Sequence, residues 1–346
     1  MTLKICVAQL NFIVGDLSGN AQKILDAAHR AHAQGAQLLL TPELSLCGYA
    51  AEDLYLRSAF IEACDEAVDQ VARELADLEG LYVVLGAPAQ SSGGLRTRSV
   101  AVTRRHNRAS VLCEGQVVCA YDKRELPNYQ VFDERRYFTP GHGVGVFEVE
   151  GVRVGLLICE DAWFDEPARL ARDAGAQMLA VLNASPFHAG KGPEREQRMR
   201  ERVADCGLPL IYAHLVGGQD EVIFEGRSFA LNAQGEPVAR AEGFREADLA
   251  LQARVGPNGV ALTAATDALV PLASADAELW DALVLGVRDY LGKNGFKGAI
   301  LGLSGGIDSA LVLAIAVDAI GADKIHAVMM PSPYTADISW IDSRDM

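Results

Sequence analysis

Apolar and polar positions in the first 90 residues alternate between two kinds of pattern. Short runs that are apolar throughout or have a period of two predict strands, and longer runs with apolar residues three and four positions apart predict helices. Gly35 follows the first helical run, as is typical of a helix end. The predicted order is strand, helix, strand, helix, strand, at Leu3–Gln9, Asn20–Gln34, Gln37–Thr41, Ala59–Leu78 and Leu81–Gly86. This alternation favours an α/β fold.

The pattern changes between Ser99 and Val149 to short β runs separated by turn residues. Glu114-Gly115 and Glu150-Gly151 mark two of these turns, which predicts hairpins and therefore a mixed sheet. A second alternating section follows, with elements at Val152–Ile158, Glu166–Ala174, Met178–Leu182, Glu194–Cys206 and Leu210–His214.

The stretch from Val255 to Ala275 contains alanine, glycine and proline and shows no periodicity. We therefore interpret it as an interdomain linker and place the linker at 261–275, between domains at 1–260 and 276–346. The second domain is predicted to contain Asp276–Lys293 as helix, Ala299–Leu303 as strand, Ser309–Ile320 as helix and Ile325–Met329 as strand. We expect this domain to be incomplete, because one strand–helix–strand unit cannot cover both faces of a parallel sheet.

Composition narrows the class of protein. The 346 residues are 50% hydrophobic and 22% charged, which is typical of a folded chain about two domains long. Lys and Arg number 31 against 46 Asp and Glu, and the net charge of −15 argues against nucleic acid as a partner. The apolar runs are shorter than the about 18 to 20 residues of a membrane helix, and the N-terminus lacks the pattern of an export signal. Seven scattered cysteines suit a reducing compartment, so we expect a cytoplasmic protein.

Three segments place a reactive group just beyond a predicted strand, where functional groups of α/β folds gather. Glu43 lies in LLLTPELSLCGY, Lys123 in VVCAYDKRELPNY and Cys159 in VGLLICEDAWF. If the three meet, Glu43 can take the thiol proton and the sulfur can attack an amide carbon. Lys123 and the backbone N–H beside Cys159 can then stabilise the oxyanion. Taken singly, each residue has an ordinary alternative as a surface carboxylate, a solvated lysine or a buried apolar thiol.

These three contexts resemble those of the nitrilase, or carbon-nitrogen hydrolase, superfamily over roughly residues 1 to 260. The resemblance implies an αββα sandwich in which Glu43 is the general base, Lys123 the oxyanion stabiliser and Cys159 the nucleophile.

Two further segments, KRELPNYQVFDERRYF and NASPFHAGK, resemble the glutaminase domain of glutamine-dependent NAD synthetases. Trp163 stands where that family is expected to have phenylalanine or another aromatic residue, and Lys191 where some members have arginine. For the aromatic residues the alternative is ordinary core packing. The resemblance implies a glutamine pocket lined by Tyr129, Glu160, Trp163, Ser185 and Lys191.

A glycine-rich turn, in GAILGLSGGIDSALVLAIAV, lies between an apolar strand and an apolar helix. Residues without side chains let a phosphate approach the backbone, and the helix N-terminus supplies donors and positive potential. The spacing fits neither the GxxxxGK[ST] P-loop nor GxGxxG, which argues against kinase-like and Rossmann folds. A flexible connection with an N-cap is the alternative.

The pattern SGGxDS resembles the PP-loop of N-type ATP pyrophosphatases, at the start of a doubly wound parallel-sheet domain. This resemblance implies that Asp308 binds Mg²⁺ and that ATP is bound by Ser304, Gly305, Gly306, Ile307, Asp308 and Ser309.

Together the resemblances imply hydrolysis of glutamine to glutamate and ammonia, without a cofactor, in the first domain. A complete second domain would use that ammonia with ATP and Mg²⁺ to amidate deamido-NAD, and we expect the chain as written to lack this second activity. The bacterial family also implies a homo-oligomer, with no nucleic-acid or membrane partner. Three alternatives remain open: a stand-alone amidase or nitrilase, a different amidotransferase with a PP-loop, and a non-enzymatic nucleotide-binding or assembly module with an inert thiol.

Overall fold

The computed structural model describes residues 2–90, 95–96, 101–102, 104–265 and 268–346. Ser99, where the predicted hairpin region begins, lies outside the described residues. The chain forms two compact units. The sandwich unit comprises Met1–Val216 with Phe224–Leu272, and the C-terminal unit comprises Gly217–Ile223 with Ala273–Met346.

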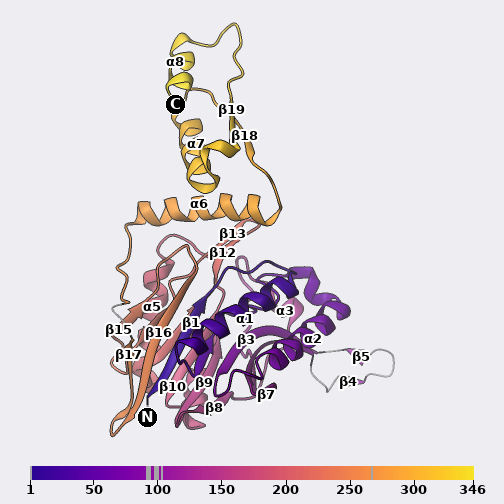
Figure 1. The fold of residues 1–346 in the computed structure, drawn as a ribbon, viewed down its shortest axis with the longest axis vertical. Helices are drawn as coiled ribbons and strands as arrows, with labels where there is room; N and C mark the ends of the chain where they lie inside the picture. The colour runs from indigo at the N-terminus through magenta and orange to yellow at the C-terminus, as the bar shows by residue number, and fades with distance from the viewer. Residues whose placement is uncertain (1, 91–94, 97–100, 103, 266–267) are drawn as a thin grey trace. The chain divides into compact units, whose positions relative to one another are not determined.

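Two mixed β-sheets form the centre of the sandwich unit (Figure 1). In the first, the strand order is β17 (Gly259–Ala264), β16 (Ala247–Gly256), β1 (Leu3–Gln9), β2 (Leu38–Leu40), β3 (Tyr82–Gln90), β6 (Arg105–Cys113) and β7 (Gln116–Asp122). In the second, it is β15 (Pro237–Arg240), β14 (Phe229–Leu231), β11 (Leu210–His214), β10 (Met178–Asn183), β9 (Val152–Ile158) and β8 (Val146–Val149). Parallel strands β1, β2 and β3, and β9, β10 and β11, lie between antiparallel neighbours. The predicted mixed sheet is thus confirmed.

The alternation of side chains along β9 shows why the two sheets pack face to face. Val154, Leu156 and Ile158 belong to the core between the sheets, together with Leu3 and Ile5 of β1. Successive side chains of a strand point to opposite faces, so the intervening residues of β9 face the other way. A strand buried on both faces reads as a continuous apolar run, as β9 does from Val154 to Ile158.

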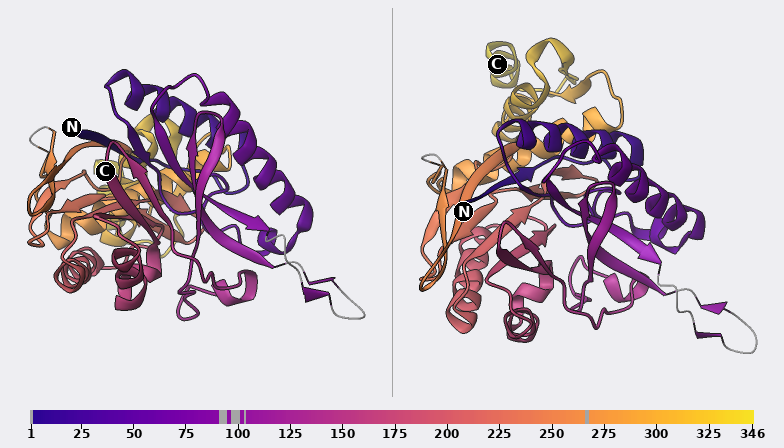
Figure 2. Two further views of the ribbon diagram at one scale, coloured as in Figure 1. Left: turned by 90° about the horizontal axis from the view of Figure 1, so that it is seen from below. Right: turned by 60° about the horizontal axis from the view of Figure 1, so that its bottom comes forward.

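Helices cover the outer faces of both sheets and complete four layers (Figure 2). On one side lie α1 (Leu17–Ala33) and α2 (Ser58–Glu74), and on the other lie α4 (Asp165–Asp173) and α5 (Lys191–Cys206). Asp16 caps α1 by accepting a hydrogen bond from the backbone N–H of Gly19 at 3.0 Å. The expected αββα sandwich is confirmed.

The shorter elements are β4 (Leu95–Arg96), β5 (Ala101–Val102), η1 (Glu52–Leu56), α3 (Glu134–Tyr137), η2 (Cys159–Trp163), β12 (Val216–Gln219) and β13 (Val222–Glu225).

The predicted linker is wrong in its first part. Gly259–Ala264 forms β17, which pairs antiparallel with β16. Val260 and Leu262 are buried in the core, whereas the small residues Ala261 and Thr263 are exposed, so the alternation is too weak to read from the sequence. Two positions of the predicted linker, 266–267, lie outside the described residues.

The C-terminal unit contains α6 (Ala275–Lys293), β18 (Ala299–Gly302), α7 (Ile307–Ile320), η3 (Ala322–Lys324), β19 (Ile325–Val328) and α8 (Asp337–Asp345). β18 and β19 pair in parallel. Val284 of α6 packs against Ile315 and Ala319 of α7 in a small apolar core. Ile300 is 78% exposed and Ile307 is 80% exposed, so much apolar surface of this unit is uncovered. Within the described ranges, no helix combines the length and the hydropathy needed to cross a bilayer.

Candidate active site

The ends of three strands from both sheets bring Glu43, Lys123 and Cys159 to one region of the sandwich unit. Glu43 lies in the loop after β2, Lys123 follows β7 and Cys159 follows β9. The Lys123 Nζ atom is 2.7 Å from Glu43 Oε1, and both side chains are fully buried. The Cys159 thiol is close enough to interact electrostatically with both. A carboxylate, an ammonium and a sulfur from distant parts of the sequence therefore share one buried environment.

Two further hydrogen bonds fix the Glu43 carboxylate. Asn107 Nδ2 donates to Oε1 at 2.7 Å, and the backbone N–H of Ala184 donates to Oε2 at 3.0 Å. The loop after Glu43 approaches β3 so closely that a Cβ at Gly86 would lie 2.3 Å from the backbone nitrogen of Leu44. Only glycine permits this approach, so Gly86 allows the loop to hold the carboxylate in place.

A second carboxylate, Glu134 of α3, also contacts Lys123. Its Oε1 atom is 2.8 Å from Lys123 Nζ and accepts a hydrogen bond from the Tyr49 hydroxyl at 3.0 Å. Burial raises the pKa of Glu134 to about 7, although Lys123 opposes this shift. Burial alone would lower the pKa of Lys123, but Glu134 and Glu43 outweigh it and hold that pKa well above its usual range. The lysine is therefore a permanent cation, and the sequence carried no spacing signal for Glu134.

Cys159 occupies a turn at the end of β9, where its buried side chain lines a cavity. It is the first residue of η2 and has a left-handed φ of 45°, which is uncommon for a residue with a side chain. Burial, followed by the Glu43 charge, raises the pKa of the thiol well above its usual range, and Lys123 lowers it by less. The resting thiol thus keeps its proton, and attack on a carbonyl carbon requires a base at the moment of reaction.

Asp161 holds this turn against the segment that follows Lys123, and sequence reasoning missed it. Its Oδ2 atom accepts hydrogen bonds from the backbone N–H of Ile158 at 3.0 Å and from the Tyr121 hydroxyl at 2.9 Å. Its Oδ1 atom accepts from the backbone N–H groups of Arg124 and Glu125 at 3.0 and 2.8 Å. One buried carboxylate therefore ties the cysteine turn to the lysine loop.

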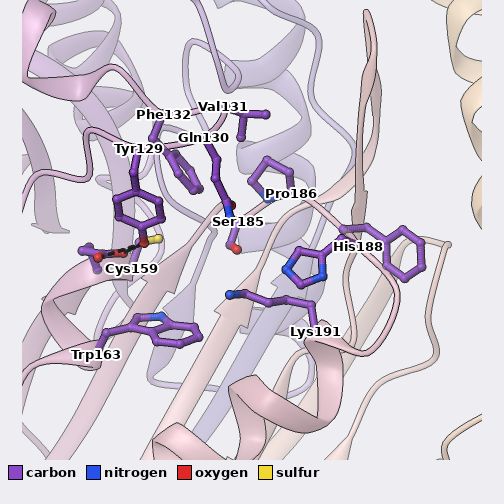
Figure 3. A pocket seen from close by; sticks show the side chains of 12 residues that line it. Tyr129, Gln130, Val131, Phe132, Cys159, Trp163, Ser185, Pro186, His188 and Lys191 are labelled. Atoms are coloured by element: carbon purple, nitrogen blue, oxygen red, sulfur yellow. Dashed lines mark hydrogen bonds between the residues drawn. The ribbon is translucent and has the colours of Figure 1, made fainter.

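A cavity of about 430 Å³ opens onto Cys159 (Figure 3). All five residues predicted for the glutamine pocket line its wall, although they come from different segments: Tyr129, Glu160, Trp163, Ser185 and Lys191. Sequence reasoning did not single out the other lining residues, which are Gln130, Val131, Phe132, Pro186, Phe187 and His188.

The polar groups of the cavity are held by specific contacts. The Tyr129 hydroxyl lies 3.0 Å from each carboxylate oxygen of Glu160. Arg195, which is buried and paired with buried Glu225, donates to Ser185 Oγ at 3.3 Å. The pocket therefore presents an acid, a hydroxyl and the Lys191 ammonium on an otherwise largely apolar wall, an arrangement that suits a small zwitterion.

The glycine turn of the C-terminal unit leads into the first turn of α7. Gly305 has a φ of +79°, and a Cβ there would lie 2.5 Å from the Ser339 carbonyl oxygen, so only glycine fits. Ser304 Oγ accepts from the backbone N–H of Gly306 at 3.2 Å and lies 3.1 Å from Ser309 Oγ. Hydroxyls, bare backbone and the N-terminus of a 14-residue helix fit a phosphate group.

Asp308 is exposed in the first turn of α7, two residues after the helix-capping residue Gly306. No group of three or more acidic, histidine or cysteine side chains in the described part of the chain is arranged to hold a metal. Mg²⁺ often takes one or two carboxylates together with phosphate oxygens and water, so Asp308 fits that role beside a bound phosphate.

Fold and site together define the nitrilase-like class of αββα sandwich proteins. The family model for carbon-nitrogen hydrolases matches residues 4–262, and the chain belongs to this family. The family model for NAD synthases matches residues 279–346.

Relatives resemble the chain across both matched regions. A glutamine-dependent NAD(+) synthetase from Xylella fastidiosa is 44% identical over 341 residues, which is 97% of this chain and 60% of the relative. The corresponding protein from Acinetobacter baylyi is 40% identical over 99% of this chain and 60% of its own length. The chain thus spans about 60% of the length of these curated relatives.

Solved structures give the same picture. The glutamine-dependent NAD+ synthetase from Acinetobacter baumannii in complex with ADP has a TM-score of 0.90 at 38% identity, covering 99% of this chain and 62% of that one. An amidase of the nitrilase superfamily from Nesterenkonia AN1 has a TM-score of 0.61 at 27% identity, covering 72% of this chain and 90% of that one.

Proposed function

We propose that the sandwich unit hydrolyses the side-chain carboxamide of glutamine to glutamate and ammonia. The observation that carries this proposal is the buried contact between Glu43 and Lys123 beside the Cys159 thiol, which lines a cavity of about 430 Å³. The similar proteins that cover nearly the whole chain are named glutamine-dependent synthetases, which supports glutamine over other amides.

We expect the reaction to proceed in two halves. The Cys159 sulfur attacks the carboxamide carbon as its proton passes to Glu43, and the oxyanion is stabilised by Lys123 and a backbone N–H next to the cysteine. Glu43 then gives its proton to the departing nitrogen, so ammonia leaves and a thioester remains. In the second half Glu43 takes a proton from water, the hydroxyl attacks the thioester carbon, and the proton returns to sulfur with release of glutamate.

The protonation states fit these roles. Because the thiol is neutral at rest, Glu43 must accept its proton during the attack. The hydrogen bonds from Asn107 and from the Ala184 backbone keep the Glu43 carboxylate in one orientation through both halves of the reaction. Lys123 cannot serve as the base because two carboxylates hold its proton in place. It acts by charge, at a position that excludes water and therefore strengthens its effect.

We further propose that the C-terminal unit belongs to the synthetase half, which amidates deamido-NAD. When bound, ATP activates the substrate carboxylate by adenylation, and Mg²⁺ neutralises the phosphate charge. The glycine turn from Ser304 to Ser309 would hold the phosphates, and Asp308 would offer one ligand to the ion. Resemblance to the bacterial synthetases supports a homo-oligomer, and seven cysteines without a disulfide support a cytoplasmic location.

The experiment is ammonia release from glutamine by the purified chain, compared with release from small aliphatic amides. The proposal predicts that glutamine is preferred and that Cys159→Ala abolishes release while the circular dichroism spectrum is unchanged. Cys119→Ala, which removes a thiol that is not among the cavity-lining residues, is the matched control and should keep full activity. Preference for a simple amide would indicate an amidase, and equal activity of Cys159→Ala would refute the proposed chemistry.

A further inference from the structure

The Lys191 ammonium lies on the face of an indole ring at the cavity wall. Its Nζ atom is 4.2 Å from the centroid of the Trp163 ring, within the range of a cation–π interaction. Lys191 is the first residue of α5 and Trp163 the last of η2, so the contact joins two elements that both contribute to the cavity lining. Figure 3 shows the amine between the Trp163 ring and Ser185.

The carboxylates around Lys191 hold it only weakly. Glu194 Oε2 is 3.4 Å away, but this side chain is 49% exposed, and ion pairs in contact with water contribute little. Glu160 also interacts with Lys191 electrostatically, yet both of its oxygens contact the Tyr129 hydroxyl. The guanidinium carbon of Arg198, on the same helix, is 5.8 Å from the Trp163 ring and adds a second positive charge to this region.

A ring face and a carboxylate differ in whether they leave the charge and the N–H groups of the ammonium free to bind a substrate. A carboxylate would neutralise the ammonium and occupy its N–H groups, whereas the ring attracts the cation through its quadrupole and carries no net charge. Lysine has four rotatable bonds and loses considerable freedom when it is fixed, so a surface that orients it in advance lowers the cost of binding. Trp163 thus leaves a charged, oriented amine in the cavity.

We propose that Trp163 is a positioning residue that holds Lys191 ready to bind the α-carboxylate of the amino-acid substrate. The inference rests on the proposed glutaminase function and adds the device that selects amides carrying a carboxylate. It predicts an effect on the KM for glutamine and none on kcat, because the contact is made equally in the ground state and in the transition state.

The test is a series at position 163 with kcat and KM for glutamine. Trp163→Phe keeps a weaker ring face and should raise KM about threefold, and Trp163→Leu removes the face and should raise it about tenfold. Phe164→Leu is the matched control, since it removes an exposed aromatic residue that does not line the cavity and should leave both constants unchanged. Equal KM values across the series would overturn the inference.

A double-mutant cycle separates positioning from simple packing. In a Lys191→Met background, Trp163→Leu should raise KM no further, because the cation that the ring orients is gone. An equal rise in both backgrounds would refute the positioning role.

Calorimetry on Cys159→Ala adds a readout without turnover. In this background Trp163→Leu should weaken the binding of glutamine and leave unchanged the binding of glutaminamide, which lacks the α-carboxylate. Absence of glutaminase activity in the wild type would refute the proposed function and this inference with it, whereas an active wild type with an unresponsive position 163 refutes the inference alone.

Discussion

Replacing Glu134 by glutamine removes one of the two carboxylates that face the Lys123 ammonium and keeps the side-chain shape. Glu134 is buried, and burial raises its pKa from the usual 4.5 to about 7. The folded protein therefore holds a proton on this group over a pH range in which the unfolded chain has released it. Its contribution to stability is fully present below pH 4.5 and is lost as the pH rises through 7.

The loss of stability can be calculated from the pKa shift of Glu134. Between pH 5 and pH 8 the ionisation of Glu134 should remove about 2 to 3 kcal/mol from the free energy of unfolding of the wild type. Glu134→Gln has no proton to lose at this position. The variant should therefore gain about that much stability relative to the wild type when the pH is raised over the same interval.

Urea unfolding at pH 5 and pH 8 measures this difference. When Trp280 and Trp340, the other two tryptophans, are replaced by phenylalanine, the fluorescence of Trp163 reports unfolding of the sandwich unit alone. Asp133→Asn, which removes an exposed carboxylate from the adjacent position, is the matched control and should follow the wild type. If Glu134→Gln and the wild type lose equal stability between the two pH values, the buried ionisation that we infer is absent.

Three further predictions concern other parts of the chain. Lys123→Gln should cost about 3 to 5 kcal/mol of unfolding free energy at pH 8, because Glu43 then faces a second buried carboxylate without a cation, and urea unfolding measures it. Burial lowers the pKa of His214 to about 4, so the contribution of the neutral imidazole to stability is fully present above pH 6.5. About 3 kcal/mol of unfolding free energy is lost as the pH falls through 4, and His214→Gln should lose less stability in acid. Gly305→Ala should destabilise the C-terminal unit by about 1 to 3 kcal/mol, since its Cβ would lie 2.5 Å from the Ser339 carbonyl oxygen, and an unchanged thermal transition would contradict this.

The strands could be predicted well because their apolar pattern is dictated by local geometry. The bounds of β1, β9 and β11 coincide with the predicted ranges, since all their residues except Lys4 and Arg153 are buried. Helix starts were less accurate. α5 begins at Lys191, three residues before the predicted start, because Pro193 in the first turn needs no hydrogen-bond donor and does not exclude the residues before it.

The site shows a similar division. Glu43, Lys123 and Cys159 could be named because each follows a strand in a distinctive context. Glu134 and Asp161 could not, because their importance comes from burial against groups distant in sequence: Glu134 contacts Lys123 and the Tyr49 hydroxyl, and Asp161 binds backbone N–H groups of two loops. No spacing rule distinguishes such a buried acid from the exposed acids beside it.

Covalent labelling tests most directly whether the acid, the ammonium and the sulfur form a working centre. Cys159 is only 3% exposed. Cys119 is partly exposed, and the other six cysteines are buried. After brief treatment with a glutamine-like electrophile, mass spectrometry should find the label on Cys159, and Glu43→Gln should greatly slow its appearance. Labelling that follows exposure, with Cys119 modified first and Cys159 unmodified, would contradict the account.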